Sequence, residues 1–137
     1  MPAAVLVDSN VILDVATADP LWSRWSIEAL ESASDGSILV INPLIYAEVS
    51  ASYDRIEDVD AIVPTSLFRR DPLPYEAAFL AGKAFVTYRR RGGTRSVPLP
   101  DFYIGAHAAV AGYLLLTRDA RRFRTYFPTL EILSPEA

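Results

Sequence analysis

Residues 3–16 read AAVLVDSNVILDVA, and this stretch carries the clearest structural signal in the chain. Five apolar residues precede Asp8, which predicts a short buried strand over Ala3–Val7. Asn10 is a residue type that commonly caps helices, so a short helix is expected over Val11–Ala16. The stretch therefore predicts a strand that turns directly into a helix, with an acid at the turn.

The same alternation of strand and helix continues along the chain. Short apolar strands are also predicted over residues 37–41, 113–116 and 130–133. Helices are predicted over residues 20–34, from residue 43, and over 55–63, 76–91, 100–111 and 120–126, with loops over 64–74 and 92–100. Such alternation predicts an α/β fold with a parallel sheet covered on both faces. The 137 residues show no repeat or linker, so a single domain over residues 1–137 is expected.

The composition excludes several kinds of chemistry. The chain has no cysteine, which rules out disulfides, zinc–thiolate sites, iron–sulfur clusters and cysteine nucleophiles. A single histidine, His107, rules out an all-histidine metal site from one chain. The apolar run before Asp8 is too short for a signal peptide, and the run over 106–117 is too short to span a bilayer. A soluble cytoplasmic protein without a membrane partner is the expectation.

Charge is distributed unevenly between the two halves of the chain. Residues 1–68 hold two basic and eleven acidic side chains, whereas residues 69–137 hold eleven basic and six acidic ones. The net charge of −4 therefore combines −9 in the first half with +5 in the second. A basic face beside an acidic cluster is compatible with nucleic-acid binding, because phosphate attraction acts over a Debye length of ~8 Å.

Four acids recur where predicted strands end or helices begin: Asp8, Glu48, Asp101 and Asp119. In open parallel sheets, ligands bind at the carboxyl ends of the strands, so these acids can meet although they are far apart in sequence. Two carboxylates ~5 Å apart repel by about 3 kcal/mol at an effective dielectric constant near ~20, so a cluster needs a cation. With oxygen ligands alone, Mg²⁺ or Mn²⁺ is favoured. Taken singly, each acid also fits a capping or solvated position.

Four stretches resemble the motifs of PIN-domain nucleases, especially the VapC-type toxins of bacterial toxin–antitoxin pairs. They are VLVDSNVILD (5–14), INPLIYAEV (41–49), LPDFYIGA (99–106) and LLTRD (115–119) with Phe123. The motifs occur in the family's order and span nearly the whole chain. Ser9 stands where the family often has threonine, and either residue supplies a hydroxyl.

The resemblance implies an α/β/α sandwich around a parallel sheet and a metal-dependent endoribonuclease. It implies that Asp8, Asp101 and Asp119 bind Mg²⁺ or Mn²⁺ directly, and that Glu48 binds the metal or orients the attacking water. The implied partners are an RNA substrate and a small antitoxin whose C-terminal segment lies across the active site. The implied assembly is a homodimer or a toxin–antitoxin hetero-oligomer.

Several polar residues near the four acids are expected to support the site or to contact RNA. Ser9, Asn10 and Thr117 are expected to support the metal-binding carboxylates by hydrogen bonds. Arg95, Arg118 and Arg121 are candidate RNA contacts, although a solvated helix face also explains the arginines that flank Asp119. Asp14 and His107 are expected to be structural, with Asp14 capping or pairing locally.

Other functions remain as alternatives. An aspartyl-phosphate phosphatase needs a second acid two residues after Asp8, but position 10 is Asn, and the sole lysine, Lys83, is far from the late motifs. A PIN-type nuclease of RNA maturation outside a toxin pair is a second alternative. A catalytically idle PIN-fold binding module is a third, and four intact acids argue against it.

Overall fold

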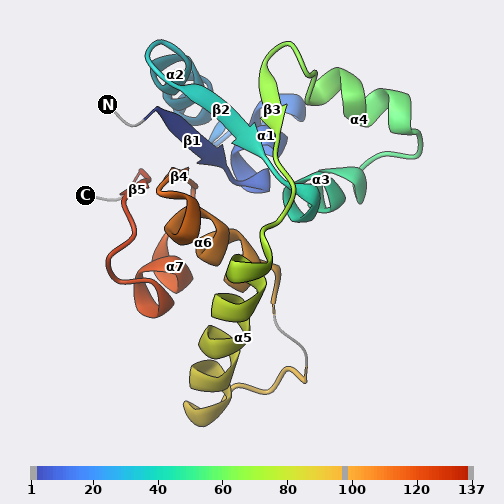
Figure 1. Cartoon of the computed structure of the whole chain (residues 1–137). Helices are drawn as coiled ribbons and strands as arrows, with labels where there is room; N and C mark the ends of the chain where they lie inside the picture. The colour runs from blue at the N-terminus through green and yellow to red at the C-terminus, as the bar shows by residue number, and fades with distance from the viewer. Residues whose placement is uncertain (1–2, 97–98, 136–137) are drawn as a thin grey trace.

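A computed structural model of the chain describes residues 3–96 and 99–135, so the terminal residues and residues 97–98 of the predicted 92–100 loop lie outside it. The strands are β1 (Ala4–Val7), β2 (Ile38–Ile41), β3 (Phe68–Arg70), β4 (Leu114–Leu116) and β5 (Ile132–Leu133). The helices are α1 (Ser9–Ala16), α2 (Ser23–Ser34), α3 (Pro43–Ser50), α4 (Ile56–Ile62), α5 (Tyr75–Arg90), α6 (Pro100–Ala111) and α7 (Arg121–Tyr126). Figure 1 shows the strands at the centre and the helices around them.

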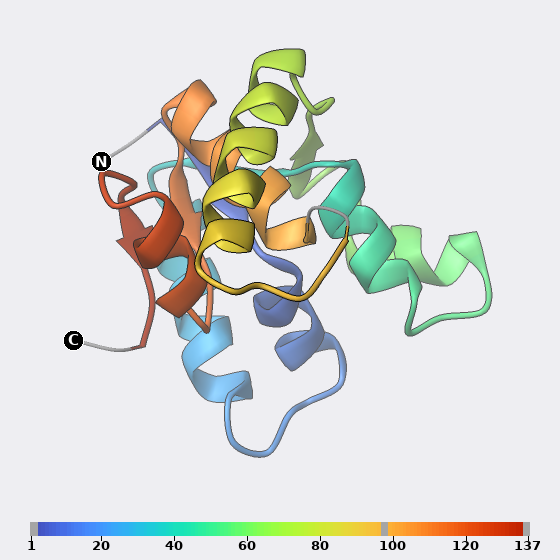
Figure 2. The same cartoon turned by 90° about the horizontal axis from the view of Figure 1, so that it is seen from below.

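All five strands form one parallel sheet in the order β3-β2-β1-β4-β5. Every residue of β1 is buried, as expected for a strand at the centre of a sheet covered on both faces. Helices α5 and α6 lie on one side of the sheet and α1 and α2 on the other (Figures 1 and 2). The predicted α/β/α sandwich is therefore confirmed.

Helix α6 connects the sheet to the outer helix layer because it is buried on two faces. Ile104 and Ala108 belong to the hydrophobic core of the sheet. Phe102 and Ala106 belong to a second apolar cluster with Ala77 and other residues of α5. This double burial explains why the sequence of α6 is apolar almost all round and fixes the position of its first turn, where Asp101 lies.

Two helix starts predicted from the sequence are wrong. Helix α1 begins at Ser9 with Asp8 as its N-cap, because the Asp8 carboxylate accepts from the Ser9 N–H and the Asn10 side chain points elsewhere. Helix α2 begins at Ser23, three residues later than the Pro20 start predicted, because the Asp19 carboxylate accepts from two backbone N–H groups in a turn that precedes the helix.

The predicted loop over residues 64–74 contains a strand that the sequence pattern missed. Strand β3 pairs with β2 over Phe68, Arg69 and Arg70 at the edge of the sheet. Only Phe68 is buried, and the two arginines are exposed, so the apolar run that marks the other strands is absent. In the described part of the chain, no helix is long and apolar enough to cross a membrane.

Gly105 on α6 is expected to be intolerant even of alanine. A Cβ atom there would lie 2.5 Å from Cε2 of Phe127 and 3.1 Å from Cδ1 of Phe123, and both rings are buried. We expect Gly105→Ala to lower the free energy of unfolding by about 1–3 kcal/mol in urea denaturation, despite alanine's better helix propensity.

Gly82→Ala is the matched control, because a Cβ at Gly82 on α5 meets nothing within 4 Å. That variant should gain about 0.5–1 kcal/mol from helix propensity alone. Equal stabilisation of both variants would show that the Phe127 ring does not close the space beside Gly105.

Candidate active site

The candidate site lies where the strand order of the sheet reverses. From β1 the chain proceeds to β2 on one side, and the later strands β4 and β5 add on the other side. The register pairs Val7 with Leu116, and the Asp8 N–H donates to the Leu116 carbonyl at 2.9 Å. Asp8 and Thr117 therefore emerge side by side at the carboxyl ends of neighbouring strands, which is where α/β sheets bind ligands.

Asp8 is an almost fully buried carboxylate, with 5% of its surface exposed. Its Oδ2 accepts from the Thr117 hydroxyl at 2.8 Å, and its Oδ1 accepts from the Ser9 N–H at 2.8 Å. Burial raises the pKa of Asp8 from its usual 3.8 to about 7, since these hydrogen bonds only partly offset the lost hydration and the charges of Asp101 and Glu48 add to the rise. Among the described residues, no arginine or lysine forms an ion pair with this carboxylate.

Glu48 is directed toward Asp8 by helix α3. Its Oε1 accepts from the Ser9 hydroxyl at 3.0 Å. Burial raises the pKa of Glu48, and the Asp101 charge raises it further. Ser9 therefore links two of the four predicted acids, through its N–H to Asp8 and its hydroxyl to Glu48.

The position of α3 is set by Asn42 and the buried His107. The Asn42 Oδ1 accepts from the Ile45 N–H at 3.0 Å and caps the helix. This bond orients the amide so that its Nδ2 donates to Nδ1 of His107 at 2.9 Å, which makes His107 neutral with its proton on Nε2. Burial lowers the pKa of His107, in keeping with this neutral form. His107 is thus structural, as predicted, and it supports the helix that carries Glu48.

Asp101 and Asp119 approach the site from α6 and from the segment before α7. Burial raises the pKa of Asp101, the guanidinium of Arg122 lowers it, and the Asp119 charge raises it. The Nη1 atom of Arg122 lies 3.3 Å from Oδ2 of Asp101. One Asp119 oxygen also accepts from the Arg121 N–H at 3.3 Å, so this acid partly caps α7.

A single open cavity of about 550 Å³ gathers three of the four predicted acids. Its lining residues are Asp8, Asn10, Asp101, Asp119, Arg121, Arg122, Thr125 and Tyr126. Glu48 is not part of this lining, but it is close enough to affect Asp8 electrostatically. The α7 wall includes Thr125 and Tyr126, which the sequence analysis did not assign to the site, and Arg122, which it considered only among the arginines that flank Asp119. A sequence signal for these residues does exist. Arg121 and Thr125, and likewise Arg122 and Tyr126, are four residues apart on the helix that follows Asp119, so each pair shares a helix face.

Asn10 and Thr117 form a chain of hydrogen bonds that ends on Asp8. The Asn10 Nδ2 donates to the Thr117 hydroxyl oxygen at 3.3 Å, and the Asn10 Oδ1 accepts from the Arg118 N–H at 3.1 Å. Thr117, rather than Asn10, therefore contacts the carboxylate of Asp8. Asn10 supports Asp8 only indirectly, because its side chain forms hydrogen bonds with the Thr117 hydroxyl and the Arg118 N–H.

Arg118 is bound within the protein. Its Nε lies 2.8 Å from Oδ2 of the buried Asp14, and its guanidinium lies over the Trp22 ring, 5.5 Å from the ring centre. The same Asp14 oxygen accepts from the buried Ser26 hydroxyl at 2.9 Å. Asp14 is thus structural, as expected, but its ionic partner is 104 residues away in the sequence rather than local.

The other two candidate RNA contacts occupy different places. Arg121 lines the acidic cavity. Arg95 is exposed on the segment after α5, where its carbonyl accepts from Arg89 at 2.8 Å, and it is not part of the cavity lining. The structure therefore brings Arg121, but not Arg95, to the cavity that Asp8, Asp101 and Asp119 line, and RNA contact by these arginines stays a prediction.

The donor set of the cavity fits a hard divalent cation. Its acidic side chains offer only oxygen atoms. Burial raises the pKa values of Asp8, Asp101 and the neighbouring Glu48, and of these three only Asp101 has a guanidinium, that of Arg122, which partly offsets the rise. Among the described residues, no three Asp, Glu or His side chains stand close enough together to enclose a metal ion. The acids therefore share one cavity but are not drawn into a coordination sphere.

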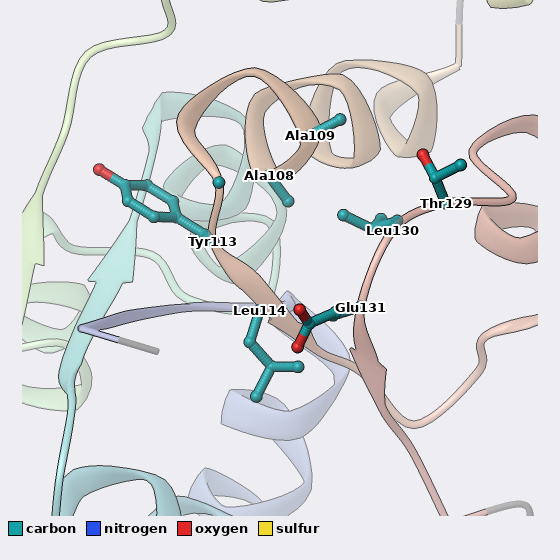
Figure 3. A pocket seen from close by; sticks show the side chains of 8 residues that line it. Ala108, Ala109, Tyr113, Leu114, Thr129, Leu130 and Glu131 are labelled. Atoms are coloured by element: carbon teal, nitrogen blue, oxygen red, sulfur yellow. The ribbon is translucent and has the colours of Figure 1, made fainter. Parts of the chain in front are cut away.

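A second cavity, of about 160 Å³, lies at the other end of the sheet, between the C-terminus of α6 and β5 (Figure 3). Glu131 is the only charged residue of its lining, which otherwise includes Ala108, Tyr113, Leu114 and Leu130. One carboxylate among mostly apolar groups offers no partner for acid–base or metal chemistry, so this cavity is not a candidate active site.

Comparisons with known proteins agree with this geometry. Residues 5–127 match the sequence profile of the family described as PIN domain. The fold is similar to VapBC2 from Rickettsia felis bound to a DNA fragment from their promoter, with a TM-score of 0.74 and 15% identity over 97% of this chain and 99% of that chain. It is also similar to VapBC-1 from nontypeable Haemophilus influenzae, with a TM-score of 0.72 and 18% identity over 96% and 97% of the two chains.

A third similar structure is a toxin–antitoxin complex from Klebsiella pneumoniae, with a TM-score of 0.67 and 18% identity over 96% of this chain and 98% of that chain. At these identities the likeness concerns the fold. A search of the curated proteins gives no match.

Proposed function

The chain belongs to the PIN-domain family, and from this premise we propose that it is a metal-dependent endoribonuclease, the toxin of a toxin–antitoxin pair. The observation that carries the proposal is the meeting of Asp8, Asp101 and Asp119 in one cavity at the carboxyl ends of β1 and β4. Buried carboxylates that repel one another are the expected state of such a site before a cation binds.

Asp8, Asp101 and Asp119 would hold Mg²⁺ or Mn²⁺, and Glu48 would hold the ion or orient a water molecule. When bound, the cation supplies charge neutralisation and an activated water for hydrolysis of an RNA phosphodiester. Thr117 and Ser9 orient the Asp8 oxygens through the two hydrogen bonds described above. Ser9 also restrains Glu48, so one residue sets the spacing of two acids.

The basic side of the cavity would receive the RNA backbone. Arg121 lies on α7 and lines the same cavity as three of the acids, and phosphate contacts of arginine position nucleic acids without reading their sequence. Arg118 would contribute indirectly, because its ion pair with Asp14 anchors the segment that carries Asp119. Arg95 would act only at a distance from the reacting bond.

The toxin role is supported by the fold. Similar structures include a toxin–antitoxin complex and cover nearly the whole of both chains. We propose a small antitoxin protein as the cytoplasmic partner, with assembly as a homodimer or a hetero-oligomer. A nuclease of RNA maturation would share the chemistry but would not arrest growth on expression, which separates the two roles.

The test is cleavage of a panel of structured RNAs by the purified protein. We expect cuts in Mg²⁺ or Mn²⁺ that disappear in EDTA, as metal-dependent hydrolysis requires. Expression of the parent chain should also arrest growth. Cleavage that persists undiminished in EDTA would contradict the metal assignment, and absence of both cleavage and growth arrest would contradict the toxin function.

A further inference from the structure

We propose that Arg122 is a built-in counter-ion of the acidic cavity that competes with the divalent cation for Asp101. The inference rests on the proposed metal site and adds a device that sets how tightly that site binds its ion. If this is so, replacing Arg122 with an uncharged residue should strengthen cation binding rather than weaken it.

The geometry places a single guanidinium on a metal-binding oxygen. The Nη1 atom of Arg122 lies 3.3 Å from Oδ2 of Asp101, and both residues line the same cavity. Arg121 contacts Asp119 through its backbone N–H. Of these two arginines in the described structure, Arg122 is the one whose side chain contacts Asp101. The Arg122 side chain is 46% exposed and therefore has room to leave the carboxylate.

A guanidinium and a divalent cation are alternative partners for the same carboxylate oxygen. An ion must displace Arg122 from Asp101, or bind beside a positive group that repels it. The loss of an exposed ion pair and the remaining repulsion between the guanidinium and the ion are both modest effects in water. Together these effects correspond to a change of about threefold to tenfold in the dissociation constant of the ion.

The same contact fixes Asp101 separately from Asp8. Arg122 on α7 holds one oxygen of Asp101, while Asp8 is held by Thr117 and Ser9 on the strand ends. Each carboxylate is therefore fixed by a different part of the fold, and no three of the described acids converge.

The experiment is calorimetric titration of the purified protein with Mn²⁺ at about 0.15 M salt, where long-range charge effects are screened. We expect Arg122→Gln to lower the dissociation constant about threefold to tenfold, and Arg122→Lys, which keeps the charge, to fall between that variant and the parent. The matched control is Arg124→Gln, because Arg124 is on the same helix, donates to Ser134 and is outside the cavity lining. It should change the constant less than about twofold.

The outcomes distinguish this inference from the proposed function. Unchanged or weaker binding by Arg122→Gln, in a parent chain that binds Mn²⁺, would overturn the competition and leave the metal site intact. An equal gain in both Gln variants would overturn it as well, because general charge would then explain the effect. Absence of Mn²⁺ binding in all variants would overturn the metal site and the inference together.

Discussion

Asp8→Asn is expected to reduce RNA cleavage by on the order of 10³-fold or more, because the proposed cation loses its most buried ligand and its charge partner. The change is nearly isosteric, and an asparagine side chain can still accept from the Ser9 N–H as Asp8 does. The measurement is the initial rate of cleavage at saturating Mg²⁺ or Mn²⁺, with the fold checked by circular dichroism. A rate within about tenfold of the parent would remove Asp8 from the proposed mechanism.

Asp14→Asn is the matched control for this variant, because Asp14 is also a buried acid of the first motif but lies outside the cavity lining. It should lose about 1–3 kcal/mol of stability, since Arg118 and Ser26 both depend on its carboxylate. Assayed well below its melting temperature, it should keep cleavage within about tenfold of the parent. Equal loss of activity in both variants would show that the loss is not specific to the acid inside the cavity.

The fold was largely predictable because its strongest signals are local. Strand β1 is a run of buried apolar residues that ends at an acid, and that pattern identifies a central parallel strand without knowledge of its neighbours. Strand β3 gave no such signal, because Arg69 and Arg70 of its three residues are exposed at the sheet edge. Its position is determined by pairing with β2, a contact that no local pattern records.

The candidate site was predictable in its residue types but not in its contacts. The ends of strands identify Asp8 and Asp119 as neighbours, because parallel strands bring their carboxyl ends together. The pair of Asp14 with Arg118 and the contact of Arg122 with Asp101 join residues far apart in the sequence, where side-chain orientation decides. The chemical roles of the four acids stay predictions until a variant is measured.

In the metal-free protein, the contribution of Asp8 to the free energy of unfolding should fall as the pH rises from about 4 to 8, and comparison with Asp8→Asn isolates this contribution. The folded-state pKa of Asp8, about 7, lies above its unfolded value of 3.8. Below about pH 4 both states hold the proton, so Asp8 has no effect on folding. Between the two values the folded state binds the proton more tightly, and stability is lost as the pH rises until it levels off above about pH 7.

The expected size of this effect is about 2–4 kcal/mol between pH 4.5 and pH 8, since each pKa unit corresponds to about 1.4 kcal/mol. Burial lowers the pKa of His107, which gives the opposite slope below about pH 6.5, so the parent curve alone combines two effects. The measurement is urea denaturation of the parent and of Asp8→Asn in EDTA at several pH values. The difference between their free energies of unfolding isolates the Asp8 contribution, because both proteins contain His107.

The stability of the variant relative to the parent should rise from pH 4.5 to about pH 7 and then level off. Saturating Mn²⁺ should reverse the order at pH 8 by stabilising the parent alone. A constant difference between the two proteins across this range would mean that Asp8 ionises in the folded protein as it does in the unfolded chain. In that case the cavity would already balance the Asp8 charge, and the main physical reason for placing a cation there would be lost.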